Sequence, residues 1–128
     1  MRAEAEGIEY APVSFTVDPE RVAAFAEVFG LGSGVPPTFL TVAEFAVFAT
    51  MIADPRLGLD FAHVVHGTQE YEFGRPLREG EDLEVHARIE SAKVRGGVGF
   101  LTVAMQIREP GGPLVATARS TMVERAAL

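Results

Sequence analysis

The fold is decided by the stretch Phe39-Leu-Thr-Val-Ala-Glu-Phe-Ala-Val-Phe-Ala-Thr-Met-Ile-Ala53, whose apolar side chains leave almost no polar face on a helix. A helix that is apolar all round must be wrapped on several sides. Thr41 and Glu44 have the spacing of a capping box at its start, and Asp54-Pro55 ends it. The sequence therefore predicts a nearly solvent-free helix over residues 41–53.

A shorter helix precedes this segment and carries signals at both ends. Asp18 suits the N-cap position, and Pro19 suits the first helical position. Apolar residues follow at helical spacing over 22–29, and Gly30 stands where a left-handed residue commonly closes a helix. Residues 1–12 are predicted to be a frayed arm that leads into a short apolar stretch.

After Gly58 the hydrophobic period changes from the helical value to two, which is typical of strands. The alternation predicts antiparallel strands over residues 63–73, 82–92, 99–108 and 114–124. A curved sheet wrapped around the apolar helix satisfies both signals. The expected fold class is therefore α+β, in an arrangement that resembles the hot-dog fold.

The strand predicted over 63–73 contains two of the three histidines. Strict alternation places His63, Gln69 and Tyr71 on one face and His66 on the other. Two histidines on opposite faces do not converge on one metal ion, and the chain has no cysteine. We therefore expect no metal site and no disulfide.

Composition narrows the class of protein further. The chain has 128 residues, which suits one domain over 1–128, and its formal net charge is −7. This acidic balance argues against nucleic acid and against an anionic membrane surface as partners. Neither a signal peptide nor a membrane-spanning segment is evident, so a cytoplasmic location is the default expectation.

Three segments carry a family resemblance: Phe15-Thr-Val-Asp-Pro-Glu-Arg-Val-Ala-Ala-Phe-Ala26, Val35-Pro-Pro-Thr-Phe39 and His66-Gly-Thr-Gln-Glu-Tyr-Glu-Phe-Gly-Arg-Pro76. Together they resemble the N-terminal dehydratase domain of the MaoC-like superfamily, over roughly residues 13–125. The resemblance implies a hot-dog fold. It also implies a role in hydrating or dehydrating 3-hydroxyacyl thioesters carried on coenzyme A or acyl carrier protein, without a cofactor.

One departure from the family changes the expected role. Catalytic members have a Gly-Asp-x-Asn-Pro-x-His motif after the first helix, and its Asp and His form the acid–base pair. This chain reads Phe29-Gly-Leu-Gly-Ser-Gly-Val-Pro-Pro-Thr38 there, with only the hydroxyls of Ser33 and Thr38, which are poor bases. The resemblance therefore implies a non-catalytic accessory subunit that shapes the acyl channel.

Two residues remain candidates for chemistry, and each has a structural alternative. Glu44 is the only carboxylate in the apolar helix, but a capping box accounts for it without chemistry. His66 precedes Gly67, and a glycine in a strand marks close approach of a neighbouring strand or of a ligand. The resemblance further implies substrate-binding roles in the strand and turn for His63, His66, Gly67, Gln69, Tyr71 and Arg75.

An exposed sheet edge invites pairing, so a second copy of the chain is one expected partner. The resemblance implies a catalytic MaoC-like subunit as the other. Two other functions stay open. The chain could be a self-sufficient hot-dog acyl thioesterase that uses Glu44 with a histidine, which would also need donors for the oxyanion. It could also bind acyl thioesters without turnover.

Overall fold

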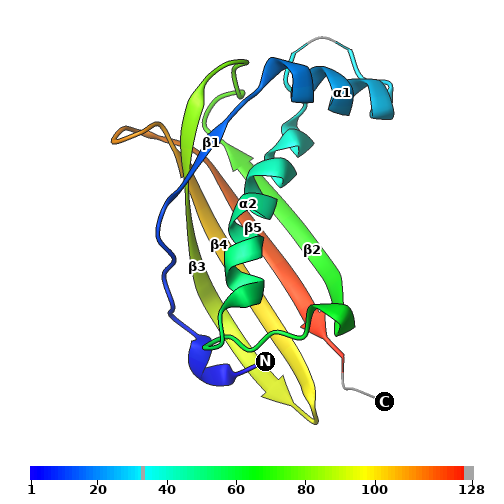
Figure 1. Cartoon of the computed structure of the whole chain (residues 1–128), viewed down its shortest axis with the longest axis vertical. Helices are drawn as coiled ribbons and strands as arrows, with labels where there is room; N and C mark the ends of the chain where they lie inside the picture. The colour runs from blue at the N-terminus through cyan, green and yellow to red at the C-terminus, as the bar shows by residue number, and fades with distance from the viewer. Residues whose placement is uncertain (33, 126–128) are drawn as a thin grey trace.

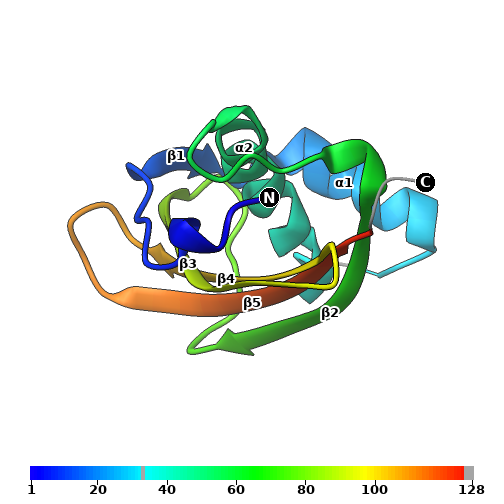
Figure 2. The same cartoon turned by 90° about the horizontal axis from the view of Figure 1, so that it is seen from below.

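The computed structural model describes residues 1–32 and 34–125, so Ser33 lies outside the described residues. An antiparallel sheet of five strands, in the order β1-β3-β4-β5-β2, curves around one side of a long helix, α2 (Figures 1 and 2). The strands are β1 (Val13–Thr16), β2 (Val64–Phe73), β3 (Asp82–Arg95), β4 (Val98–Arg108) and β5 (Leu114–Glu124). The helices are α1 (Pro19–Phe29) and α2 (Leu40–Ala53), with short 3₁₀ turns η1 (Ala3–Ala5), η2 (Pro37–Phe39) and η3 (Phe61–His63). The predicted α+β, hot-dog architecture is confirmed.

The alternation predicted for β3 is also confirmed, and it explains how the core forms. Leu83, Val85, Ala87 and Ile89 point toward α2 and are at most 3% exposed. Their neighbours on the other face include Glu84 and Arg88, which meet solvent. A period of two therefore gives this sheet one apolar and one solvated face.

The ends of α1 are as predicted. The side chain of Asp18 accepts a hydrogen bond from the backbone N–H of Glu20, and Pro19 occupies the first helical position. Gly30 closes the helix in the left-handed region, with φ of 64°. A side chain at that φ would be strained, which accounts for glycine there.

The capping box predicted for α2 is wrong. Phe39 occupies the N-cap position, and no side chain caps the helix. Thr41 donates its hydroxyl proton to the carbonyl of Thr38 instead. Because α2 begins at Leu40, Glu44 lies one turn inside the helix, and its side chain is buried.

The expectation of a nearly solvent-free α2 is also wrong for the single chain. Ala43, Val47 and Met51 are buried against the sheet, but Phe45 on the opposite side is 66% exposed. The sheet covers only one face of the helix, as Figure 2 shows. The other face of α2 is apolar in sequence and uncovered by this chain. Among the described residues, no helix is long and apolar enough to cross a membrane.

The N-terminal arm is packed, and its prediction as frayed is wrong. Ala5 is fully buried, and Tyr10 is nearly so. The main chain follows the edge of β3, where the N–H groups of Gly7 and Tyr10 donate to the carbonyls of Ile89 and Ala87. The arm thus forms hydrogen bonds with backbone groups at the edge of β3, beyond the end of β1. The local sequence pattern of residues 1–12 could not indicate this pairing.

Candidate functional site

A buried carboxylate lies where α2 packs on the sheet. Glu44 is 2% exposed. The hydroxyl of Tyr71 on β2 donates to its Oε1 at 2.5 Å, and the hydroxyl of Ser120 on β5 donates to its Oε2 at 3.0 Å. A buried polar group needs hydrogen bonds to replace the lost water, and a side-chain hydroxyl lies within hydrogen-bond distance of each oxygen of Glu44.

Gln69 on β2 extends this cluster. Its Oε1 lies 2.5 Å from the Oγ of Ser120, while its Nε2 is buried and meets no partner among the described residues. The Ser120 hydroxyl has a single proton, so it donates either to Gln69 or to Glu44. In the reversed orientation of the amide, Nε2 would donate to Ser120 and leave that proton for Glu44. In either orientation, one polar atom of Gln69 is left over.

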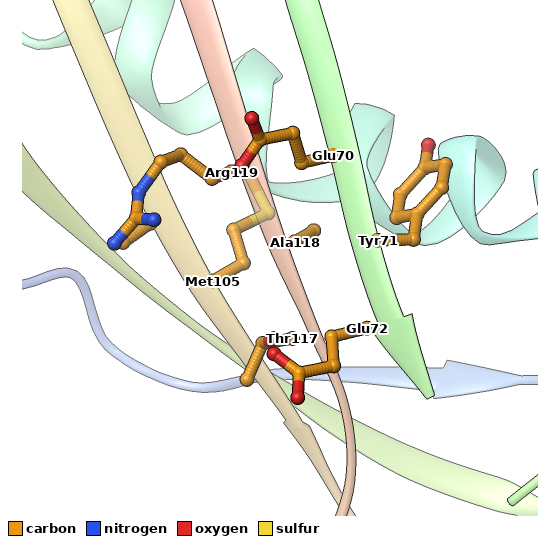
Figure 3. A pocket seen from close by; sticks show the side chains of 8 residues that line it. Glu70, Tyr71, Glu72, Met105, Thr117, Ala118 and Arg119 are labelled. Atoms are coloured by element: carbon orange, nitrogen blue, oxygen red, sulfur yellow. The ribbon is translucent and has the colours of Figure 1, made fainter. Parts of the chain in front are cut away.

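Tyr71 acts as a fixed donor in this cluster. Burial, and secondly the hydrogen bond to Glu44, raises the pKa of the Tyr71 phenol well above its ordinary value. The phenol therefore keeps its proton at neutral pH and donates it to the carboxylate. Figure 3 shows the ring directed toward the helix, away from the carboxylates of Glu70 and Glu72 on the same strand.

A β-bulge in β2 changes the faces predicted from the sequence. His66 pairs with Met122 and Thr68 pairs with Thr121, so Gly67 is an extra residue with no partner in β5. A bulge shifts the alternation by one residue. His66 therefore lies on the same side as Gln69, and its predicted place on the opposite face is wrong.

Gly67 is required by a close approach of strands. A Cβ at this position would lie 3.0 Å from the Oγ1 and 3.2 Å from the carbonyl oxygen of Thr121. Of the two explanations for a glycine in this strand, the close approach of a neighbouring strand accounts for Gly67, and the close approach of a ligand does not.

A cavity of about 260 Å³ lies between α2 and β2, and Glu44 and Gln69 of the cluster line it. Its walls are mostly apolar, and its polar residues are few. The lining consists of Phe45, Phe48, Ile52, Phe61, Val64 and Met122, together with Thr41, Glu44, His66 and Gln69. An apolar cleft with a few convergent polar groups is the usual form of a small-molecule site.

The other candidates from the sequence lie elsewhere. His63 ends η3 and does not belong to β2; its Nδ1 lies 2.7 Å from a carboxylate oxygen of Asp60. Arg75 is held within the chain by Glu81, at 2.6 Å, and by Glu109, at 2.9 Å. Neither residue lines the cavity, so the structure brings together Glu44, His66, Gln69 and Tyr71 but not His63 and Arg75.

A second hollow, of about 480 Å³, lies over β2, β4 and β5 (Figure 3). Glu70, Glu72 and Arg119 contribute its polar side chains. Arg119 is already paired with Glu90 at 2.8 Å, and all of these side chains are exposed or partly exposed. We interpret this hollow as the solvated side of the sheet. Among the described residues, no group of three or more His, Cys, Asp or Glu could hold a metal ion.

Ser120 was missed by the sequence analysis, although a signal exists. In β5 the inward positions run Ala116, Ala118, Ser120 and Met122, and all four are buried. A serine at an inward position of an otherwise apolar row needs a hydrogen-bond partner. That partner is Glu44, which is distant in the sequence.

Comparisons with known proteins identify a matching family model and relatives of this chain. The family model described as "FAS1-like, dehydratase domain region" matches residues 31–118. A UPF0336 protein of Saccharopolyspora erythraea is 37% identical over 126 residues, which cover 98% of this chain and 78% of that protein.

Two solved structures share the fold. The C-terminally truncated HadBC (3R-hydroxyacyl-ACP dehydratase) complex of Mycobacterium tuberculosis superposes with a TM-score of 0.83 at 19% identity, over 96% of this chain and 99% of that one. A MaoC-like dehydratase superposes with a TM-score of 0.78 at 22% identity, over 96% of this chain and 43% of that one. On the family model and the sequence identity together, this chain belongs to the UPF0336 family and contains the FAS1-like dehydratase domain region.

Proposed function

We propose that this chain is the accessory, substrate-channel subunit of a (3R)-hydroxyacyl-thioester dehydratase or enoyl hydratase, acting on acyl groups carried by coenzyme A or acyl carrier protein. The observation that carries the proposal is the apolar cavity between α2 and β2, in a chain whose α1–α2 connection has no acid and no imidazole.

The connection between the helices bears on the chemistry. Removing a proton next to a thioester carbonyl needs a base within hydrogen-bond reach. Residues 30–38 supply only two hydroxyl groups, and the backbone carbonyl of Thr38 is already engaged by Thr41. General acid–base catalysis contributes roughly 10²–10⁴-fold, so a chain without both groups depends on a partner for turnover.

The cavity suits the acyl chain of such a substrate. Three aromatic rings and the aliphatic side chains of Ile52, Val64 and Met122 line it, and they offer dispersion contacts without directional demands. Contacts within the fold account for Glu44, because Tyr71 donates a hydrogen bond to one of its oxygens and the hydroxyl of Ser120 lies 3.0 Å from the other. This supports a channel wall more than a reaction centre.

The partner proposed is a catalytic MaoC-like subunit, with a homodimer as the form of the chain when it is expressed alone. β2 is an edge strand of the sheet, and exposed apolar side chains lie beside it on η3 and α2, at Phe61 and Phe45. An open strand edge beside an apolar surface favours pairing with another chain. The HadBC structure of the same fold is itself a complex.

A second function is favoured by one observation, the presence of Glu44 and His66 in the same cavity. An acyl thioesterase could use this carboxylate as its base. Against this, Glu44 is 2% exposed, and the Nε2 of His66 lies 3.0 Å from the carbonyl oxygen of Thr68 and makes no hydrogen bond to Glu44 among the described contacts. We therefore place the thioesterase second.

The test is a crotonyl-thioester hydration assay on the purified chain, alone and after co-expression with a MaoC-like protein of the same genome that has the Gly-Asp-x-Asn-Pro-x-His motif. We expect no turnover from the chain alone and turnover from the complex. Robust hydration by the chain alone contradicts the accessory role. Thioester hydrolysis that Glu44→Gln abolishes without unfolding the protein favours the thioesterase.

A further inference from the structure

The open edge of β2 carries backbone groups that the described part of the chain does not pair. β2 stands last in the strand order β1-β3-β4-β5-β2, so β5 covers one of its edges and leaves the other open. The N–H of Gly74 donates to the carbonyl of Val115, and antiparallel pairs alternate between hydrogen-bonded and non-hydrogen-bonded positions. The N–H and carbonyl groups of Gln69, Tyr71 and Phe73 therefore point to the open edge, where they can pair with an antiparallel strand of another chain.

Two carboxylates alternate with these open backbone groups. Glu70 and Glu72 lie on either side of Tyr71 in the strand, and both are exposed on the solvated face of the sheet (Figure 3). Arg119 lies opposite Glu70 in β5, but its guanidinium makes two hydrogen bonds of 2.8 Å to Glu90 and is directed away from β2. Among the described residues, neither Glu70 nor Glu72 forms an ion pair. The open edge therefore presents uncompensated negative charge.

Pairing of two β2 strands would bring these carboxylates together. In an antiparallel pair, residues whose backbone groups point across the edge stand opposite each other, so the residues between them also stand opposite each other. In a two-fold register centred on any of residues 70–72, at least one carboxylate thus faces a carboxylate of the other copy, with Cβ atoms about 5 Å apart. Like charges directly opposite are destabilising, and each copy has a net charge of −7. The backbone of β2 therefore allows self-pairing, while its charged side chains oppose it.

We propose that Glu70 and Glu72 select the partner of the β2 edge, which is a strand with Lys or Arg at the positions opposite them, and that a second copy of this chain is the weaker partner. Opposite charges at cross-strand positions strengthen a pairing that like charges weaken. The inference rests on the proposed function, because it assigns this basic strand to the catalytic subunit. It adds the residues that distinguish that subunit from a second copy.

The experiment uses the full chain, with the double variant Glu70→Lys/Glu72→Lys as a copy whose edge carries cations. Wild-type chain and isotope-labelled variant are mixed in equal amounts, and native mass spectrometry measures the share of each kind of dimer. We expect the mixed dimer to exceed its statistical share, with a dissociation constant about tenfold below that of the wild-type dimer. In sedimentation velocity, added salt should weaken the mixed dimer and strengthen the wild-type dimer, because salt screens both the attraction and the repulsion.

The matched control is Glu4→Lys/Glu9→Lys, which makes the same change in net charge. Both residues are exposed on the N-terminal arm, which lies along β3 and away from the β2 edge. Mixed with the wild-type chain, this variant should stay close to the statistical share. Glu72→Lys alone repeats the test if the double variant of the edge does not fold.

Three results would overturn the inference. They are a statistical share for the edge variant, an equal excess of mixed dimer for the control, and the absence of dimers from every mixture. Each of them leaves the proposed function standing, because the hydration assay with a co-expressed catalytic subunit tests that function separately.

Discussion

At the scale of single residues, the arrangement around Glu44 depends on two donors that approach the carboxylate from two strands. Tyr71 and Ser120 are on β2 and β5, and Glu44 is on α2, so their hydrogen bonds join the helix to the sheet. The cost of a missing donor is larger than the gain from a hydrogen bond made, because the abandoned carboxylate oxygen stays buried.

Tyr71→Phe removes one of these donors and little volume. Since Oε1 of Glu44 is then buried without its partner, we expect the free energy of unfolding to fall by about 1–3 kcal/mol, measured by urea denaturation. Tyr10→Phe is the matched control, because the other tyrosine donates to Asp54, which also binds Arg56. An equal loss in the two variants would contradict a special demand at Glu44.

The same tyrosine predicts how stability depends on alkaline pH. Its pKa is raised in the folded chain, so folding keeps the proton on a phenol that an unfolded chain releases near pH 10. The stabilisation is complete below that value and is lost as the pH rises further. Urea titrations between about pH 9 and 11 should show a falling free energy of unfolding. The slope should be smaller in Tyr71→Phe, and an unchanged slope would speak against a buried phenol.

At the scale of elements, the features that depend on neighbouring residues could be predicted from the sequence. Those that depend on contacts between distant segments could not. The caps of α1 and the alternation of β3 depend on neighbouring residues, and both are as expected. The start of α2 was misjudged because Glu44 suits a cap in sequence but bonds to β2 and β5 in space. Of the candidate site, Glu44, His66, Gln69 and Tyr71 were named in advance, whereas Ser120 depended on knowing which strand faces Glu44.

The bulge in β2 is the element whose misreading had the largest effect, because it moves His66 to the side of the cavity. Alternation alone cannot locate an extra residue, since the bulge is set by pairing with β5 and by the close approach of Thr121 to Gly67. The glycine was the one available signal in the sequence.

Gly67→Ala tests this account of the bulge. The added Cβ would lie 3.0 Å from the Oγ1 of Thr121, and the strand backbone would have to shift to admit it. We expect a loss of about 1–3 kcal/mol in the free energy of unfolding, as for other overpacked sites. Gly32→Ala is the control, because a Cβ there meets no described atom within 4 Å and should leave stability nearly unchanged. Equal stability of the two variants would contradict the close approach.

At the scale of the whole molecule, the uncovered face of α2 links the fold to the proposed assembly. The sequence predicted a helix covered all round, whereas the single chain covers it on one side only. Both observations agree if a second chain supplies the missing cover. Large exposed apolar surfaces on soluble proteins commonly mark such contacts.

Phe45→Glu tests whether α2 is covered by another copy when the chain is expressed alone. The side chain is 66% exposed, so in a monomer the change should cost little stability, but in a dimer it places a charge against an apolar partner surface. We expect light scattering to report a dimer for the wild-type chain at micromolar concentration and a shift toward monomer for the variant. Phe100→Glu, at a phenylalanine 45% exposed on the opposite side of the sheet, should leave the dimer intact. A monomeric wild-type chain, or equal effects of the two substitutions, would show that self-association does not cover α2, and only a different partner chain could then do so.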